Sequence, residues 1–69
     1  MKNQTKAKVP IENKMLLTVN EAAEYSNIGT SKIREMANRA RCPFVFHNGS
    51  RVLIKRKEFE SFISNQIEI

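Results

Sequence analysis

Aspartate is absent from this sequence, and cysteine and histidine occur once each, as Cys42 and His47. A single cysteine cannot form an internal disulfide, which fits a reducing cytoplasm. One cysteine and one histidine also cannot build a protein-only zinc site of the usual type within one chain. Without aspartate there is no Ser-His-Asp constellation, and no other nucleophile motif is present. We therefore predict a protein that is not an enzyme and needs no metal or cofactor.

Long apolar runs are missing as well. No stretch of about 18 apolar residues could span a membrane, and the lysine-rich start lacks the apolar segment of a signal peptide. The chain has 69 residues. A chain of this length forms one domain at most and buries only about 60% of its unfolded surface. We expect a soluble, cytoplasmic protein with a modest core, no membrane contact and no enclosed active site.

Positive charge is concentrated in one part of the chain. Residues 31–57 contain eight Lys or Arg residues and a single acid, Glu35. The net charge is +3 over residues 1–14, −2 over 15–30, +7 over 31–57 and −3 over 58–69. A basic surface carried by particular elements suits a negative backbone, so double-stranded DNA is the expected partner. Two alternatives stay open: a lysine-rich solvated surface, and an adaptor whose basic face docks on an acidic protein.

The first 14 residues are lysine-rich and carry few apolar groups. Such a segment cannot bury enough surface to offset its ordering entropy, so we predict a flexible basic tail. The tail either touches phosphates or is simply solvated. Residues 15–69 are predicted to form the domain, whose first element is a short strand at Met15-Leu16-Leu17.

A capping box marks the start of the first predicted helix. The Thr18 hydroxyl can accept a hydrogen bond from the Glu21 amide, and the Glu21 carboxylate can reach back to the Thr18 amide. The apolar face that follows contains Val19, Ala22 and Ala23. We expect the helix to end at residues 27–29, with Gly29 in the left-handed conformation of a tight turn.

A second helix is predicted after this turn, capped by Thr30 or Ser31. Its apolar positions have the spacing of a buried helical face and are Ile33, Met36, Ala37 and Ala40. Its opposite face is polar and basic and comprises Ser31, Arg34, Glu35 and Asn38, flanked by Lys32 and Arg39. Two helices joined by a short turn that contains glycine, with a basic second helix, are typical of a helix-turn-helix.

Asn48-Gly49 lies between two runs of β-branched and aromatic residues, 44–47 and 51–54. This arrangement predicts a hairpin with a type I′ turn, in which both central residues have positive φ. A last helix is predicted to begin at Lys57. The order of the elements predicts an α+β fold: a small winged helix-turn-helix with three helices, a β-hairpin wing and a short N-terminal strand.

The aromatic residues are expected in the core rather than on a platform that stacks bases. They are Tyr25, Phe44, Phe46, Phe59 and Phe62. Cys42 is expected to behave as a small buried hydrophobe, and His47 as an ordinary strand residue.

The polar face of the second helix offers the candidates for reading base edges, which are Arg34, Glu35 and Asn38. An arginine can donate two hydrogen bonds to guanine, and an asparagine can pair with adenine in the major groove. Basic residues around them are expected to contact phosphates, which position a protein without specifying sequence. These residues are Lys32, Arg39 and Arg41. The alternative is an exposed helix face whose charge is incidental.

Asn48, Gly49, Ser50 and Arg51 would form the tip of the wing. A tip that carries an arginine can lie along the DNA backbone or enter a narrow minor groove. The alternative is simply a good hairpin turn, which accounts for Asn48-Gly49 but leaves Arg51 without a role. The full set of predicted DNA-binding residues is Ser31, Lys32, Arg34, Glu35, Asn38, Arg39, Asn48, Ser50, Arg51 and Lys55.

Several of these segments resemble the excisionase-type DNA-binding family, a MerR-like winged-helix group. The segments similar to its helix-turn-helix are residues 17–25 (LTVNEAAEY), Ile28-Gly29 and Ile33-Arg34. Those similar to its wing and closing helix are residues 48–54 (NGSRVLI), Lys57 and Phe59. The resemblance covers residues 16–64, and the chain is similar to the excisionases of conjugative transposons. The N-terminal motif alone is shared by many bacterial and phage regulators, so it indicates the fold better than the function.

The resemblance implies a role in site-specific recombination. Such a protein binds near the ends of an integrated element, bends the DNA and biases a tyrosine integrase toward excision. It would act as a monomer, alone or beside further copies on adjacent sites, with the second helix in a major groove and the wing on the neighbouring backbone or minor groove. A small transcriptional regulator of a mobile element or phage stays open as an alternative. The chain lacks the long dimerisation helix of MerR regulators, and residues 39–43 match no pattern of the family.

Overall fold

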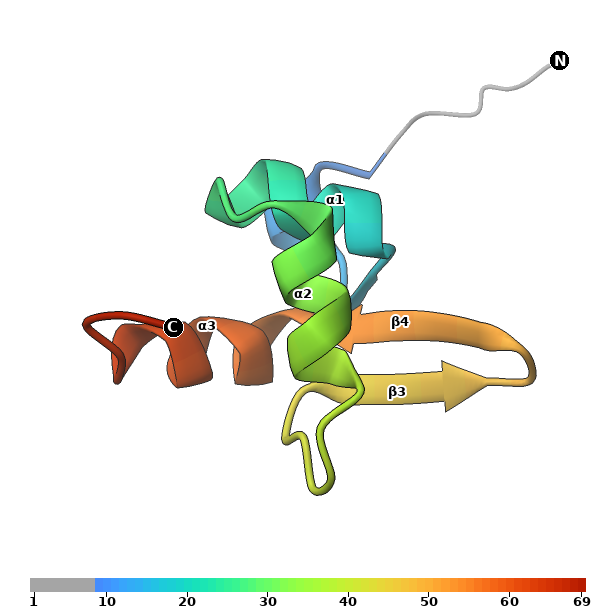
Figure 1. Cartoon of the computed structure of the whole chain (residues 1–69). Coiled ribbons are helices and arrows are strands. Elements are labelled where there is room, and N and C mark those ends of the chain that lie inside the picture. Colours follow the sequence, from blue (N-terminus) through green and yellow to red (C-terminus); the bar gives the residue numbers. More distant parts are fainter. Residues whose placement is uncertain (1–8) are drawn as a thin grey trace, which may run out of the picture.

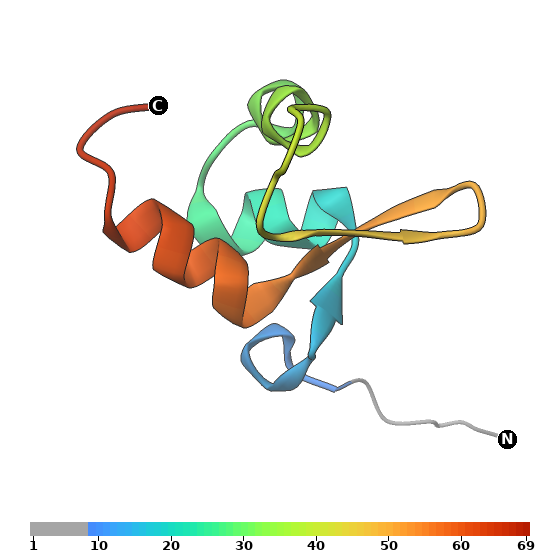
Figure 2. The ribbon, with the colours of Figure 1, turned by 90° about the horizontal axis from the view of Figure 1, so that it is seen from below.

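The computed structural model describes residues 9–69 (Figure 1). In chain order, its elements are η1 (Ile11–Asn13), β2 (Leu16–Leu17), α1 (Val19–Ser26), α2 (Thr30–Ala37), β3 (Val45–Asn48), β4 (Arg51–Lys55) and α3 (Arg56–Ser64). Three α-helices and a three-stranded antiparallel sheet confirm the predicted small α+β winged helix-turn-helix. The hairpin and α3 extend from opposite ends of the body (Figures 1 and 2). None of the helices in this part of the chain has the length and apolar character needed to cross a membrane.

Strand β4 is the centre of the sheet, with β2 on one side and β3 on the other. Leu16 and Leu17 of β2 pair with Lys55 and Ile54 of β4. The predicted short strand is therefore confirmed, without Met15. This pairing joins the beginning of the domain to the base of the hairpin, and it fixes where α1 starts relative to β4.

The turn of the hairpin differs from the prediction. Asn48 pairs with Arg51 in the ladder, so the two-residue loop is Gly49-Ser50 rather than Asn48-Gly49. Gly49 has a φ of 63°, and neither Asn48 nor Ser50 has a positive φ. A positive φ at the first loop position alone, occupied by glycine, is typical of a type II′ turn rather than type I′. The strand register decides the turn type, and the Asn-Gly dipeptide does not determine that register.

Helix α1 begins as predicted. Glu21 N donates to Thr18 Oγ1 at 3.1 Å, and Thr18 N donates to Glu21 Oε1 at 3.0 Å. These two bonds confirm the capping box.

The connection from α1 to α2 differs from the prediction. Asn27, with a φ of 64°, takes the left-handed conformation that was expected of Gly29. Gly29 has a φ of −63° and is the N-cap of α2, a place that was predicted for Thr30 or Ser31; no side chain caps this helix. Asparagine tolerates the left-handed region better than most other residues, so the helix can end there, two residues before the glycine.

Helix α2 is shorter than its apolar spacing suggested. It ends at Ala37, with Asn38 as its C-cap. Ala40 was predicted on the buried face, but it is exposed in the turn that follows. Arg41 then has a φ of 63°, a conformation that costs a residue with a Cβ roughly 1–2 kcal/mol. This reversal leads the chain to Phe44, which is fully buried.

The core lies between the helices and the sheet, and no polar side chain of residues 9–69 is buried in it. Phe44 meets Phe59 edge to face with ring centroids 5.1 Å apart, and the Phe62 ring centroid lies 5.3 Å from that of Phe44. Burial of one such ring contributes about 1.5–3 kcal/mol. The core residues are Leu17, Val19, Ala22, Ile33, Met36, Ala37, Phe44, Ile54 and Phe59.

Two of the five aromatic residues predicted in the core are at the surface instead. Phe46 is 42% exposed and Tyr25 is 36% exposed. Side chains alternate along a strand, and in β3 it is Val45 that packs against the core, so Phe46 faces the other way. The three remaining rings, Phe44, Phe59 and Phe62, follow the prediction.

Residues 11–14 belong to the folded body, although the predicted tail included them. Ile11 of η1 packs against the core. The Lys14 ammonium forms an ion pair with Glu21, and Arg56 Nε donates to the Lys14 carbonyl at 2.7 Å. Residues 1–8 of the predicted tail lie outside the described residues. Helix α3 begins at Arg56, one residue before the predicted Lys57.

Candidate nucleic-acid interface

Helix α2 turns its polar side away from the core. Ile33 and Met36 are buried in the core, whereas Arg34 and Glu35 between them are exposed. Figure 2 shows α2 almost end-on at one side of the body, with the hairpin reaching out beyond it. Ser31, Asn38 and Arg39 are also exposed, whereas Lys32 is half-buried. Asn38 and Arg39 lie beyond the last turn of the helix rather than on its face.

Glu35 lies between two cations on this surface. Its carboxylate is 3.5 Å from Lys32 Nζ and 3.4 Å from Arg39 Nη2. All three side chains are substantially exposed, so each pair contributes little to stability. The pairs instead reduce the local positive charge on either side of Glu35. Within residues 9–69, Arg34 forms no such pair.

The hairpin carries a second exposed group of predicted residues at its tip. Asn48, Ser50 and Arg51 are exposed, and the tip is the part of the hairpin farthest from the body (Figure 1). Among the described residues, Arg51 has no acidic partner.

Lys55 is not brought together with the tip residues. It is half-buried at the base of the hairpin, where it pairs with Leu16. There it lines a separate hollow together with Asn13, Met15, Arg56, Lys57 and Glu58. The structure therefore separates Lys55 from the other nine predicted residues.

One hollow joins the two exposed groups, and we call it the wing hollow. It is lined by Thr18, Val19, Asn20, Arg34, Arg51 and Val52. Arg34 reaches it from α2 and Arg51 from the start of β4, so α2 and the wing line one hollow. Four of its six residues are polar, and none is acidic.

Asn20 is a residue of this surface that sequence reasoning missed. It is exposed in the first turn of α1, and the capping box at Thr18 could place it only near the start of a helix. Its closeness to Arg51 follows from the pairing of β2 with β4, which brings the chain after Leu17 alongside the chain before Ile54. No local pattern in the sequence gives that register.

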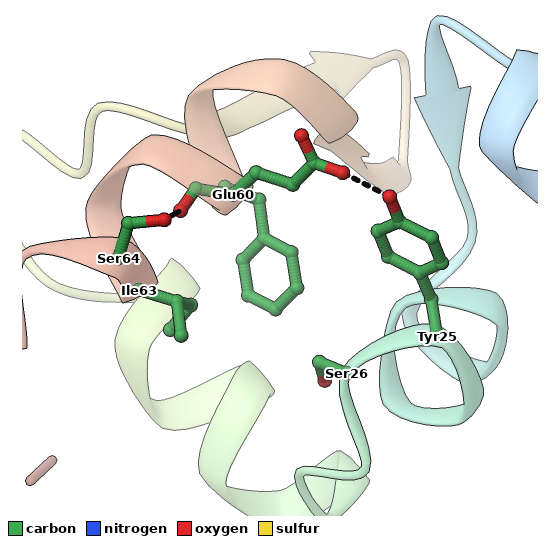
Figure 3. A pocket seen from close by; sticks show the side chains of 6 residues that line it. Tyr25, Ser26, Glu60, Ile63 and Ser64 are labelled. Atoms are coloured by element: carbon green, nitrogen blue, oxygen red, sulfur yellow. Dashed lines mark hydrogen bonds between the residues drawn. The ribbon is translucent and has the colours of Figure 1, made fainter.

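A hollow between α1 and α3 has a different character (Figure 3). It is lined by Tyr25, Ser26, Phe59, Glu60, Ile63 and Ser64. The Tyr25 hydroxyl donates to Glu60, and this bond raises the pKa of Tyr25. Arg56 Nη1 also lies 3.5 Å from the same carboxylate. An acid and apolar groups line this surface, so it does not suit a phosphate.

The loop after α2 adds two cations near the C-terminal end of the helix. Arg39 and Arg41 line a shallow hollow with the half-buried Cys42 and with Phe44 and Phe62 behind it. Cys42 packs against the core, as expected of a small hydrophobe. His47 is exposed in β3 opposite Val52, which agrees with an ordinary strand position.

Comparison with known proteins identifies the family. A family model described as a helix-turn-helix domain matches residues 16–67. The chain is also 39% identical over 56 residues to the excisionase from transposon Tn916 of Streptococcus agalactiae serotype V, an alignment that covers 80% of this chain and 84% of that protein. This chain belongs to the excisionase family. The surface formed by α2 and the wing is thus part of an excisionase-family DNA-binding domain, as the sequence resemblance predicted. No solved structure matches the chain significantly.

Proposed function

We propose that this excisionase-family protein binds and bends DNA at the ends of a mobile element and thereby promotes excision by a tyrosine integrase. The observation that carries the proposal is the alignment with a transposon excisionase over most of both chains. Its DNA-binding part is supported by the wing hollow, where α2 and the wing contribute one arginine each to a surface without acids. Binding to chromosomal DNA would place this action in the cytoplasm of a bacterium.

In the proposed complex, the exposed side of α2 enters a major groove. Arg34, Glu35 and Asn38 face base edges, while Ser31, Lys32 and Arg39 contact the flanking phosphates. The wing, through Asn48, Ser50 and Arg51, lies on the neighbouring backbone or in the minor groove. A DNA contact of Lys55 has less support than those of the other residues, because Lys55 lies at the base of the hairpin and lines a separate hollow.

The proposed mechanism is architectural rather than catalytic. Bending a site of 20–30 base pairs costs on the order of 1–6 kcal/mol, and contacts from the helix and the wing together can offset that cost. Further copies on adjacent sites would add their bends to the first. The integrase would then meet DNA ends whose geometry favours excision, and it would perform every cleavage and joining step itself.

An excision assay tests this proposal. Purified integrase is supplied with the ends of the source element, with and without this protein, while a gel assay with the site at different positions in the fragment measures bending. We expect bending, no cleavage by the protein alone, and more excision when it is added. Tight binding and clear bending without any response of excision would contradict the proposal and favour a transcriptional regulator. An Arg51→Ala variant links the two readouts, because it should lose both the bending of DNA and the stimulation of excision.

A further inference from the structure

The wing hollow has the chemistry of a small anion site. Within residues 9–69, neither Arg34 nor Arg51 pairs with an acidic side chain. The N–H donors of both guanidinium groups are therefore not occupied by a carboxylate. The Asn20 side chain adds an amide that can donate as well. Two cations and one amide that converge from separate elements favour an acceptor with several charged oxygens.

Three segments that are distant in the sequence build this hollow. Asn20 lies in the first turn of α1, Arg34 in the middle of α2 and Arg51 at the first position of β4. The pairing of Leu17 with Ile54 holds the start of α1 against β4, and buried Ile33 holds α2 against the same core. The spacing of the three side chains is therefore set by the packed fold rather than by a loop.

We propose that the wing hollow holds one backbone phosphate of the bound duplex, with Asn20 and Arg51 donating to its oxygens. Arg34 adds positive charge from the α2 side, whichever base edge it also reads. The proposal rests on the DNA-binding mode proposed above and adds a neutral residue, Asn20, to the contacts. A phosphate held between α1 and the wing fixes the position of the wing relative to the helix on the DNA. The angle of the bend would then depend on this one contact.

The substitution Asn20→Asp tests the contact directly. A carboxylate in place of the amide repels the phosphate, and we expect the affinity for a duplex that carries the end of the source element to fall roughly tenfold. An acid in the first turn of a helix is favourable for the helix itself, so thermal unfolding should show a fold that is at least as stable. The matched control is Gln66→Glu, the same amide-to-acid change at an exposed residue beyond α3. It should leave the affinity nearly unchanged.

A second measurement identifies the phosphate. Single phosphates of the site are replaced one at a time by uncharged methylphosphonates. We expect one replacement that weakens the native protein clearly and has no further effect on an Asn20→Ala, Arg51→Ala double variant. The proposal is overturned if Asn20→Asp and Gln66→Glu bind alike, or if every methylphosphonate affects the native protein and the double variant equally. Retained binding without stimulated excision would instead contradict the proposed function and leave the phosphate contact standing.

Discussion

At the scale of single residues, the cations of α2 fall into two groups. Lys32 and Arg39 share the carboxylate of Glu35, whereas Arg34 has no acidic partner within residues 9–69. An arginine with its full set of donors can recognise guanine through two parallel hydrogen bonds. A lysine that is shared with an acid acts mainly as a positive charge near the backbone. The two residues should therefore contribute to binding in different ways.

Substitution of Arg34 and of Lys32 should separate these contributions. Arg34→Ala should cost roughly 1–3 kcal/mol on the specific site and clearly less on random duplex, where only its charge beside the phosphate is lost. Lys32→Ala should weaken binding to both duplexes alike and reduce the salt slope by about one unit. Fluorescence anisotropy at several salt concentrations measures both quantities. Equal losses on specific and random DNA for Arg34→Ala would refute its assignment to a base.

Gly49 and Arg51, which are neighbours in the wing, should differ in a comparable way. Gly49 has a φ of 63° and open space where a Cβ would lie, so Gly49→Val should destabilise the wing through the backbone alone. Ser50→Ala is the control for stability, because the second loop position has no positive φ. Arg51→Ala should leave the melting temperature nearly unchanged and weaken DNA binding. If Arg51→Ala instead unfolds the domain, the residue is structural and the wing loses its main proposed contact.

At the scale of elements, the turn between α1 and α2 gives Asn27 the left-handed conformation expected of Gly29 and makes Gly29 the N-cap of α2. Gly29 has an ordinary φ of −63° at an N-cap without a side-chain bond, and nothing lies within 4 Å of where its Cβ would be. Gly29→Ser supplies the missing cap and restricts the unfolded chain, so it should stabilise the domain by about 0.5–1 kcal/mol. Asn27→Ala should destabilise it by roughly 1 kcal/mol, because alanine is strained in the left-handed region. Thermal melting of both variants measures this, and a lower melting temperature for Gly29→Ser would contradict the turn geometry.

The start of α1 gives a prediction about pH. The ion pair with Lys14 and the bond from the Thr18 amide lower the pKa of Glu21 below its ordinary 4.5. A lowered carboxyl pKa stabilises the fold fully above the unfolded value, and this stabilisation is lost as the pH falls through the folded value. Glu21→Gln should therefore cost about 1 kcal/mol at neutral pH, and the cost should shrink below pH 4.5. Urea unfolding of both proteins across this range measures the difference, and a constant difference would contradict it.

Elements that depend on residues close together in the chain could be predicted from the sequence. The capping box at Thr18, the apolar face of α2 and the hairpin around Gly49 depend on neighbouring residues, and all three are present. Two of the errors occur where distant parts of the chain decide the outcome. Strand register turned the expected type I′ turn into a loop at Gly49-Ser50, and the entry of Phe44 into the core accompanies an α2 that ends before Ala40.

The candidate site follows the same division. The exposed residues of α2 and the wing tip were predictable, because each belongs to an element with a clear local pattern. Asn20 was not, because its closeness to Arg51 requires the pairing of β2 with β4. Lys55 was predicted together with the tip residues, but it lies at the other end of β4, at the base of the hairpin.

At the scale of the whole molecule, the charge distribution predicts how binding responds to salt. Among residues 9–69, most of the exposed cations lie on α2, the loop after it and the wing, and α1 and α3 carry acids. If about four phosphates are neutralised, log K should fall with log salt with a slope of roughly −3 to −4. Titrations of a specific duplex between low and physiological salt measure it. A slope near zero would contradict DNA binding through this face and favour an adaptor that docks on an acidic protein.

The central position of β4 also bears on when the protein becomes active during its synthesis. Leu16 finds its partner only when Lys55 has been made, so a nascent chain can form the two helices but cannot hold them against the wing. Contacts across such long stretches of sequence form late and together in folding. A truncated or proteolytically cut chain would therefore be inert rather than partly active. Competence to bind DNA would arise in a single step, once the central strand has left the ribosome and is free to pair.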